Sequence, residues 1–116
     1  KDDVMKFDVP SSGISQLGLW VGLSNGSSFA GSRWATWDTY RDMKVLAGDF
    51  NGDGRDDVMK FDVFNTCGHG LWVGLSSGSS FNATRWATWC TDTRMQVLAG
   101  DFDGDGKADV MKFDVP

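Results

Sequence analysis

The sequence predicts an all-β fold made of tandem four-stranded antiparallel units, and three observations support that prediction. The chain of 116 residues repeats itself, because residues 19–54 match residues 71–106 at 26 of 36 positions. Short runs alternate between apolar and polar residues and are bounded by glycine and serine, which is typical of strands. No stretch of the chain combines helical periodicity with capping residues.

The repeats divide the chain into three parts. Residues 1–54 are expected to form a first repeat that starts inside an acidic loop, and residues 55–106 a second repeat. Residues 107–116 repeat the opening segment and are expected to form the first strand of a third repeat. A period of about fifty residues is typical of propellers, solenoids and arrays, in which one unit cannot bury its apolar faces alone.

Four runs recur in the same order in each repeat. They read DVMKFDV, LWVGLS, SRWATW or TRWATW, and MKVLAGDF or MQVLAGDF, and glycine and serine fill the connections between them. In the first run, Met5 and Phe7 share one face of the expected strand, while Val4 and Lys6 share the other. Because both faces carry apolar groups, neighbouring units are expected to cover both. Four antiparallel strands covered in this way form the blade of a β-propeller.

The fourth run leads into an acidic loop, GDFNGDGRDD at residues 48–57 and GDFDGDGKAD at residues 100–109. Side-chain oxygens stand at alternate positions and glycines allow a tight turn, an arrangement of hard ligands that suits calcium. Carboxylates packed this closely without a cation would repel one another. The predicted ligands are Asp49, Asn51, Asp53, the Arg55 carbonyl and Asp57 in the first loop, and Asp101, Asp103, Asp105, the Lys107 carbonyl and Asp109 in the second.

Comparison of the two loops narrows the ligand set. The position before the last ligand is Asp56 in one copy and Ala108 in the other, so it is not expected to bind the ion. An EF-hand would need glutamate at the twelfth loop position, which Lys60 and Lys112 occupy instead. A simple Asp-, Asn- and Gly-rich turn is the alternative. Calcium is favoured because both copies keep four side-chain oxygens at matching positions.

The segments GDFNGDGRDDV and GDFDGDGKADV, each placed between strands of a repeat of about fifty residues, resemble the calcium loops of the FG-GAP-like, or VCBS, repeat family. The resemblance covers essentially the whole chain and is to the broader group, since the literal Phe-Gly and Gly-Ala-Pro signature is missing. It implies integrin-α-type propeller blades with one calcium ion in the loop between the last strand of one repeat and the first strand of the next. The same ligands carry over, with Asp3 as the last ligand of a partial third site.

Three features favour an extracellular or cell-surface location. In a meandering blade Cys67 and Cys90 fall at the same end, so a disulfide is expected between them, as in oxidising compartments. Asn25 and Asn82 begin N-x-[ST] triplets and are candidate glycosylation sites; Asn65 begins a weaker one. Loops of this kind in extracellular modules bind calcium at about 10⁻⁴ to 10⁻³ M.

Tryptophans recur at matched positions of the runs and are expected mainly to pack the blades. If any tryptophans are exposed and bind a glycan, Trp37 and Trp89 are expected to be the exposed ones because they adjoin variable loops, with Arg33 and Arg85 as nearby donors. The lysine and aspartate of the first run are expected to pair with each other: Lys6 with Asp8, Lys60 with Asp62, and Lys112 with Asp114.

Catalysis is not expected. His69 is the sole histidine and is interpreted as a loop residue, and the paired carboxylates all belong to the predicted calcium loops. The net charge of -5 does not favour nucleic acid, and no apolar run is long enough for a membrane span.

The sequence thus predicts a non-enzymatic, secreted, calcium-binding module with a structural or adhesive role. It is expected to assemble with further copies into a closed propeller or a filament, because two blades leave apolar faces uncovered. A lectin with sugar sites between blades, and a propeller domain of a larger secreted enzyme, are the alternatives.

Overall fold

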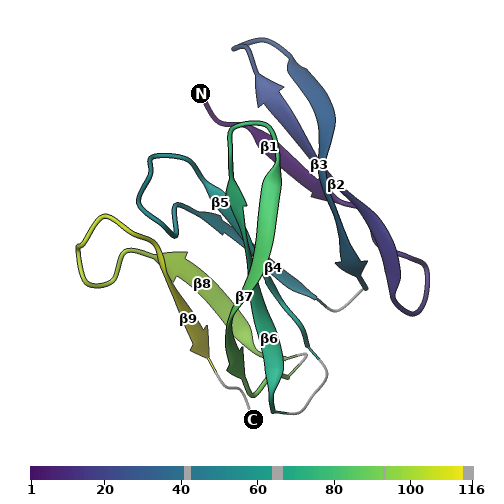
Figure 1. The fold of residues 1–116 in the computed structure, drawn as a ribbon, viewed down its shortest axis with the longest axis vertical. Coiled ribbons are helices and arrows are strands. Elements are labelled where there is room, and N and C mark those ends of the chain that lie inside the picture. The colour runs from purple at the N-terminus through teal and green to yellow at the C-terminus, as the bar shows by residue number, and fades with distance from the viewer. Residues whose placement is uncertain (41–42, 64–66, 93, 114–116) are drawn as a thin grey trace. The chain divides into compact units, whose positions relative to one another are not determined.

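The structure is a computed structural model that describes residues 1–40, 43–63, 67–92 and 94–113. All regular elements in these ranges are strands, so the all-β prediction is confirmed (Figure 1). In chain order they are β1 (Val4–Phe7), β2 (Ser15–Ser24), β3 (Phe29–Thr39), β4 (Lys44–Gly48), β5 (Asp57–Phe61), β6 (His69–Ser76), β7 (Phe81–Trp89), β8 (Gln96–Gly100) and β9 (Asp109–Phe113).

The strands form three antiparallel sheets, β1-β2-β3, β4-β5-β6-β7 and β8-β9. The four-stranded sheet therefore combines the fourth run of one repeat with the first three runs of the next. The acidic loop is the reason, because it folds β4 back onto β5 with Gly48 opposite Asp57. The chain divides into two compact units, Lys1–Arg41 and Asp42–Pro116. The propeller interpretation stays a prediction.

The β2–β3 and β6–β7 hairpins are longer than the sequence pattern suggests. The β2–β3 ladder extends from the pair Ser15 and Thr39 to the pair Ser24 and Phe29, so β2 begins four residues before the predicted run. The turn beyond it is closed by the Asn25 side chain, whose Oδ1 accepts hydrogen bonds from the backbone N–H groups of Ser27 and Ser28, both at 2.9 Å. The hydrogen bonds of the Asn25 side chain thus fix where the hairpin turns.

Each long hairpin contains a β-bulge at the same place. Leu19 pairs with Ala35 and Trp20 with Arg33, so the register skips Trp34. The second repeat has the same shift, at Trp86. An inserted residue reverses the in-and-out order of the side chains beyond it. The bulge therefore decides which tryptophans face the interior.

The unit Asp42–Pro116 has a continuous apolar core. Its central strand β5 is buried along its whole length. The buried cluster consists of Phe50, Met59, Phe61, Val63, Leu71, Val73 and Met95. The β8–β9 hairpin contributes Val97, Ala99, Ala108 and Val110, which pack against this cluster. One face of the four-stranded sheet is thus covered by the next hairpin of the same unit.

The unit Lys1–Arg41 buries the residues that match the core residues Leu71 and Val73 of the second repeat. Leu19 and Val21 of β2 are 0% and 6% exposed. The Phe7 and Trp37 rings lie 6.2 Å apart at 49°, and Phe61 and Trp89 repeat this contact at 5.9 Å and 50°. The repeated sequence thus produces the same aromatic pair in both units.

A Cys67–Cys90 disulfide closes the end of the β6–β7 hairpin, as the sequence predicts. It joins the residues just beyond the pair His69 and Trp89. The first repeat has Asp38 in place of Cys90, and there the Gln16 amide donates a hydrogen bond to Asp38 Oδ1. A covalent bond in one repeat thus stands where the other has a polar cross-strand contact.

A second repeated contact joins lysine, aspartate and tryptophan on neighbouring strands. Lys60 Nζ lies 2.8 Å from Asp62 Oδ1, and Trp72 Nε1 donates to Asp62 Oδ2 at 3.0 Å. In the first repeat the corresponding distances are 2.9 Å for Lys6 and Asp8 and 2.9 Å for Trp20 and Asp8. The predicted lysine–aspartate pairs are confirmed in both repeats. The third predicted partner, Asp114, lies outside the described residues, and Lys112 Nζ donates to the Cys90 carbonyl at 3.1 Å.

Glycine beside this contact makes room for the indole. A Cβ built on Gly70 would lie 2.6 Å from Trp72 Nε1 and 3.0 Å from Arg85 Cδ. We expect Gly70→Ala to displace the indole, break its bond to Asp62, and lower the free energy of unfolding by about 1–3 kcal/mol. Urea unfolding measures the cost, and the indole N–H resonance of Trp72 reports the lost bond.

Gly31→Ala is the matched control, because nothing lies within 4 Å of a Cβ built there. Equal effects of the two substitutions would show that the indole contact contributes nothing specific.

Candidate metal site

The candidate site is the acidic turn of the β4–β5 hairpin and its copy between β8 and β9. In both turns the second and third glycines adopt left-handed backbone conformations, with φ of 78° and 87° at Gly52 and Gly54 and the same values at Gly104 and Gly106. Residues with a Cβ rarely adopt such angles. The glycine spacing therefore imposes one turn shape on both loops.

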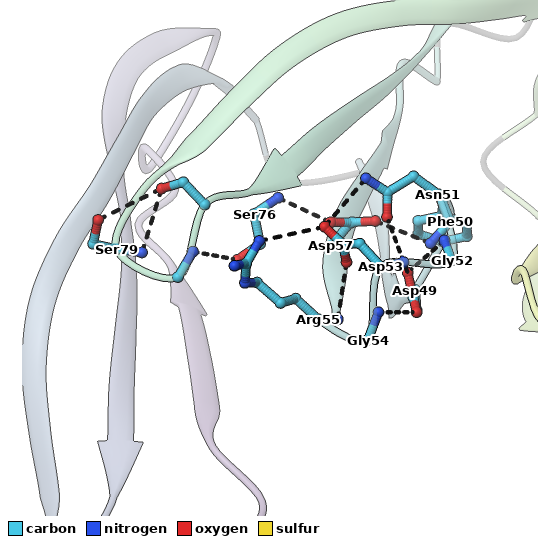
Figure 2. A network of polar contacts seen from close by, with 12 residues as sticks. Asp49, Phe50, Asn51, Gly52, Asp53, Gly54, Arg55, Asp57, Ser76 and Ser79 are labelled. Atoms are coloured by element: carbon cyan, nitrogen blue, oxygen red, sulfur yellow. Dashed lines mark hydrogen bonds and ion pairs between the residues drawn. The ribbon is translucent and has the colours of Figure 1, made fainter.

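The first aspartate of each loop organises the turn by accepting backbone hydrogen bonds. Asp49 Oδ1 accepts from Gly52 N at 2.7 Å and from Asp53 N at 3.1 Å, and Oδ2 accepts from Gly54 N at 2.8 Å (Figure 2). Asp101 makes the same three contacts in the second loop, at 2.8, 3.1 and 2.8 Å. The carboxylates of Asp49 and Asp101 thus fix the backbone of the turn, and with it the positions of the predicted ligands that follow in each loop.

The last aspartate ties the first loop to a second turn. Asp57 is 1% exposed, and its Oδ2 accepts from Phe50 N at 3.0 Å while its Oδ1 accepts from Ser76 N at 2.9 Å (Figure 2). Ser76 ends β6. Asp3 makes the corresponding bond to Ser24 N at the end of β2, also at 2.9 Å. Asp3 therefore makes the same link to the following hairpin as Asp57, a link that was not foreseen, and its role as a ligand stays a prediction.

The second loop brings three carboxylates together. One oxygen each of Asp101, Asp103 and Asp109 lies within 4.8 Å of the others. This is the convergence that a hard divalent cation needs, since calcium takes six to eight oxygens at about 2.3–2.6 Å. In the first loop Asn51 replaces Asp103 and directs its amide at Asp53 Oδ2, 3.3 Å away. Asp101, Asp103 and Asp109 could thus hold a metal ion, and the first loop has one carboxylate fewer. The identity of the ion and the number of sites stay predictions.

The seventh position of each loop contributes its N–H to the turn. Arg55 N donates to Asp53 Oδ1 and Lys107 N to Asp105 Oδ1, both at 2.9 Å. The Arg55 guanidinium also lies 3.5 Å from Asp53 Oδ2. The carbonyls predicted as ligands belong to these residues and stay predictions.

The eighth position, excluded as a ligand from sequence, has a packing role in the second loop. Ala108 N donates to the Asp49 carbonyl of the preceding loop at 2.7 Å. The Ala108 methyl lies 3.0 Å from a Cβ built on Gly48. Ala108 faces the neighbouring loop, whereas Asp56 is exposed. A small residue thus stands at the position that packs against another loop, and a charged residue at the position that faces solvent.

Crowding changes the acidity of these carboxyls. Burial, together with the nearby charges of Asp53 and Asp49, raises the pKa of Asp57 against two backbone hydrogen bonds that lower it. Loss of solvation and the charges of Asp105 and Asp109 likewise raise the pKa of Asp103. The pKa of Asp101 is lowered, chiefly by the Gly106 N–H. A cation in the loop would oppose the repulsion between carboxylates, which adds to the loss of solvation in raising the pKa of Asp57 and of Asp103.

The tryptophans with the largest exposure are not those predicted for ligand binding. Trp37 is 9% exposed and Trp89 packs against Phe61, whereas Trp20 and Trp86 are 37% and 49% exposed. The expectation that Trp37 and Trp89 are the exposed pair is therefore wrong. The reason is the bulge, beyond which Trp37 and Trp89 take the inward positions. The proposed donors Arg33 and Arg85 are exposed, on β3 and β7.

The remaining predicted residues lie as follows. Asn25 is in the β2–β3 turn and exposed, and Asn82 is exposed within β7, opposite Leu75. Asn65 lies outside the described residues. His69 is the first residue of β6, paired with Trp89, and not in a loop as interpreted from sequence.

Two features of the site were missed from sequence. Ser24 and Ser76 end matching LWVGLS runs, and this repeated position was the available signal for their role as donors to Asp3 and Asp57. The exposure of Trp86 required knowledge of the bulge, whereas the alternation of β2 alone already places Trp20 opposite Leu19 and Val21.

No protein-family model matches this chain, and neither a curated protein nor a solved structure is significantly similar to it. The resemblance of the loops to FG-GAP-like repeats stays a prediction. Within the described ranges, none of the regular elements is a helix of the length and apolarity that crossing a membrane requires.

Removing the Asp57 carboxylate should destabilise the fold even without metal. We expect Asp57→Ala to lower the free energy of unfolding in metal-free buffer by about 1–3 kcal/mol, because buried N–H groups of Phe50 and Ser76 lose their acceptor. Asp109→Ala should cost less, since the structure shows one bond to Asp109, from the exposed Phe102 N–H. Chemical denaturation of each variant measures the difference.

Asp56→Ala is the control, because Asp56 is exposed and Ala108 stands at the matching position. A loss with Asp56→Ala as large as that with Asp57→Ala would contradict the role given to the two hydrogen bonds.

The raised pKa values predict how metal-free stability changes with pH. A carboxyl whose pKa is higher in the folded state binds its proton more tightly there, so lowering the pH from about 7 to about 4 should stabilise the metal-free protein through Asp57 and Asp103. The lowered pKa of Asp101 acts in the opposite sense, and only below the ordinary aspartate value of about 3.9.

Thermal melts in metal-free and in calcium-containing buffer test this dependence. The two melting curves should converge as the pH falls, because protons and calcium compete for the same oxygens. Metal-free melting temperatures that fall steadily over the same range would contradict the prediction.

Proposed function

We propose that this chain is a calcium-stabilised, non-enzymatic repeat module with a structural or adhesive role outside the cell. The observation that carries the proposal is the convergence of Asp101, Asp103 and Asp109 in the turn between β8 and β9. The same turn, with the same glycine angles and the same aspartate-to-backbone bonds, recurs between β4 and β5. Asp3 supplies the last position of a third, partial site.

Calcium is proposed over magnesium because of the donors. The loops offer several flexible carboxylates, an amide and backbone carbonyls, which suit the large and irregular coordination shell of calcium. Magnesium requires a near-ideal octahedron and usually keeps several waters.

A structural role is proposed because the acidic residues already serve the fold. Asp49 and Asp57 accept backbone hydrogen bonds from the loop and from the β6–β7 turn. An ion held by these residues would fix two turns at once. No residue is assigned a catalytic role, because the carboxylates are committed to these bonds.

The disulfide supports the proposed location. Cys67–Cys90 is formed in the structure, and disulfides persist mainly in oxidising compartments. An extracellular module would also meet calcium at concentrations that loops of this affinity class require. The two observations favour a secreted or cell-surface protein.

Calcium binding can be tested directly. We expect calorimetric titration to find two sites, and each ion to add about 1.4 kcal/mol to the free energy of unfolding at ten times its dissociation constant. Asp101→Asn should remove the second site and leave the first. Excess chelator should lower the melting temperature of the parent chain.

Asp56→Asn is the control, since it also removes one aspartate charge, in the first loop, at a position outside the proposed ligand set. Melting unchanged by chelator, or equal losses of calcium binding in the two variants, would refute the calcium proposal.

A further inference from the structure

The chain contains two Asn-Gly dipeptides, and they lie in different surroundings. Asn25 and Gly26 are in the turn between β2 and β3, whereas Asn51 and Gly52 are in the first acidic loop; all four residues are exposed. Asparagine before glycine is prone to lose its side-chain amide, because no Cβ on the glycine hinders attack by its nitrogen on the amide carbon. The groups around each amide therefore decide which one reacts.

The carbonyl oxygen of the Asn25 side chain is surrounded by hydrogen-bond donors. Asn25 Oδ1 accepts from Ser27 N and from Ser28 N, both at 2.9 Å, and from Ser27 Oγ at 3.2 Å. Attack on the amide carbon moves negative charge onto this oxygen. Donors that are already aimed at the oxygen stabilise this charge without reorganisation, as in an oxyanion hole. The turn therefore favours attack on the Asn25 amide.

The nitrogen that would attack Asn25 has a neutral partner. Gly26 N donates to Ser24 Oγ at 3.1 Å. The Lys1 side chain lies beside the turn, with its Cε 3.9 Å from a Cβ built on Gly26. The nitrogen must lose its proton in order to attack, and a nearby positive charge favours the negatively charged form that results. The electrostatic surroundings of this dipeptide thus also favour the reaction.

The other dipeptide lies among carboxylates. Gly52 N donates to Asp49 Oδ1 at 2.7 Å, and the Asn51 amide donates to Asp53 Oδ2 at 3.3 Å. A nitrogen or an oxygen that becomes negative in this loop would face carboxylates at hydrogen-bonding distance, and like charges so close together are unfavourable. The acidic loop therefore protects the Asn51 amide from attack.

We propose that Asn25 is a site of spontaneous deamidation, which the β2–β3 turn promotes. Hydroxide removes the proton from Gly26 N, and this nitrogen forms a bond to Asn25 Cγ. The bond from Cγ to Nδ2 breaks, and the amine takes a proton from water and leaves as ammonia. Water then opens the cyclic imide at Cγ, which gives aspartate, or at the main-chain carbonyl carbon, which gives isoaspartate. The net reaction exchanges ammonia for water and needs no oxidant or reductant.

The reaction changes the turn and removes a candidate glycosylation site. Aspartate keeps an oxygen that can accept from Ser27 N and Ser28 N, whereas isoaspartate carries the main chain through Cγ and displaces this acceptor. Neither product can accept an N-linked glycan, because the N-x-[ST] triplet requires the asparagine amide. Deamidation and glycosylation of Asn25 thus exclude each other. The proposal goes beyond the proposed function and requires no metal ion.

The second repeat supplies a matched turn without an amide, because Ser77 stands where the first repeat has Asn25. Ser77 N donates to the Ser80 carbonyl at 3.0 Å, and Asn25 N donates to the Ser28 carbonyl at 3.1 Å. The glycines that follow have φ of 93° and 96°, and each donates to the hydroxyl of the serine before the turn at 3.1 Å. A cation lies beside this turn too, since Arg55 Nε is 3.8 Å from a Cβ built on its glycine. Ser77→Asn should therefore create a second reactive amide.

Peptide mapping by mass spectrometry measures the reaction in unglycosylated chain held for several days in mildly alkaline buffer with chelator. Asn25 should convert to aspartate and isoaspartate about tenfold faster than Asn51, because donors are fixed on its developing oxyanion. The asparagine introduced by Ser77→Asn should convert at a rate close to that of Asn25. Ser27→Ala removes the hydroxyl donor, so it should slow Asn25 about twofold or more and leave Asn51 unchanged. Circular dichroism verifies that each variant is folded.

The unfolded chain shows whether the turn or the dipeptide alone is responsible. In guanidinium chloride Asn25 should slow, and its rate should approach that of Asn51. Equal rates at the two residues in the folded chain would overturn the proposal, as would an Asn25 rate that unfolding does not lower. An unreactive asparagine after Ser77→Asn would overturn it as well. These measurements contain chelator, so their outcome is independent of whether the loops bind calcium.

Discussion

The described structure depends on aspartate side chains that accept backbone hydrogen bonds in the acidic hairpin turns. Asp49 and Asp101 each bind three N–H groups of their own loop, and this curvature returns the chain so that β4 meets β5 and β8 meets β9. Asp57 then connects the first loop to the end of β6. The carboxylates that form the turn are the ones proposed to hold the ion. Binding of an ion by them would therefore be coupled to the stability of the hairpins.

This sharing has an electrostatic consequence. Each loop places several carboxylates close together, and the pKa of Asp57 and of Asp103 is raised, first by loss of solvation and then by the charges of neighbouring aspartates. The backbone N–H groups compensate in part, because they are aimed at Asp49, Asp57 and Asp101. A cation would complete the compensation where hydrogen bonds do not reach. The free energy of unfolding and the proposed affinity for an ion thus depend on the same carboxylates.

Repetition allows each contact to be compared with its copy. The Lys–Asp–Trp contact and the Phe–Trp pair recur with nearly identical distances, which shows that local sequence and strand pairing are sufficient to form them. Phe50 and Phe102 have the same neighbours in sequence and differ tenfold in exposure, 5% against 58%. Burial of this residue therefore depends on the strands packed around its hairpin, which are β6, β7 and the β8–β9 hairpin for Phe50, and not on its own segment.

The sequence by itself determined the strand runs, the glycine-punctuated turns, the lysine–aspartate pairs and the cysteine pair, because each follows from alternation, turn chemistry or residues near one another in an antiparallel hairpin. It also indicated that Asp56 and Ala108 are not ligands. Only the tertiary structure decided which strands share a sheet, that Ala108 contacts the preceding loop, and that Asp57 and Asp3 bind Ser76 and Ser24. The tryptophans show the physical reason: a single inserted residue at Trp34 and at Trp86 reverses the two-residue alternation beyond it, so Trp37 and Trp89 take inward positions and Trp86 is exposed. An alternation pattern specifies two faces, but the register between strands specifies which face is inside.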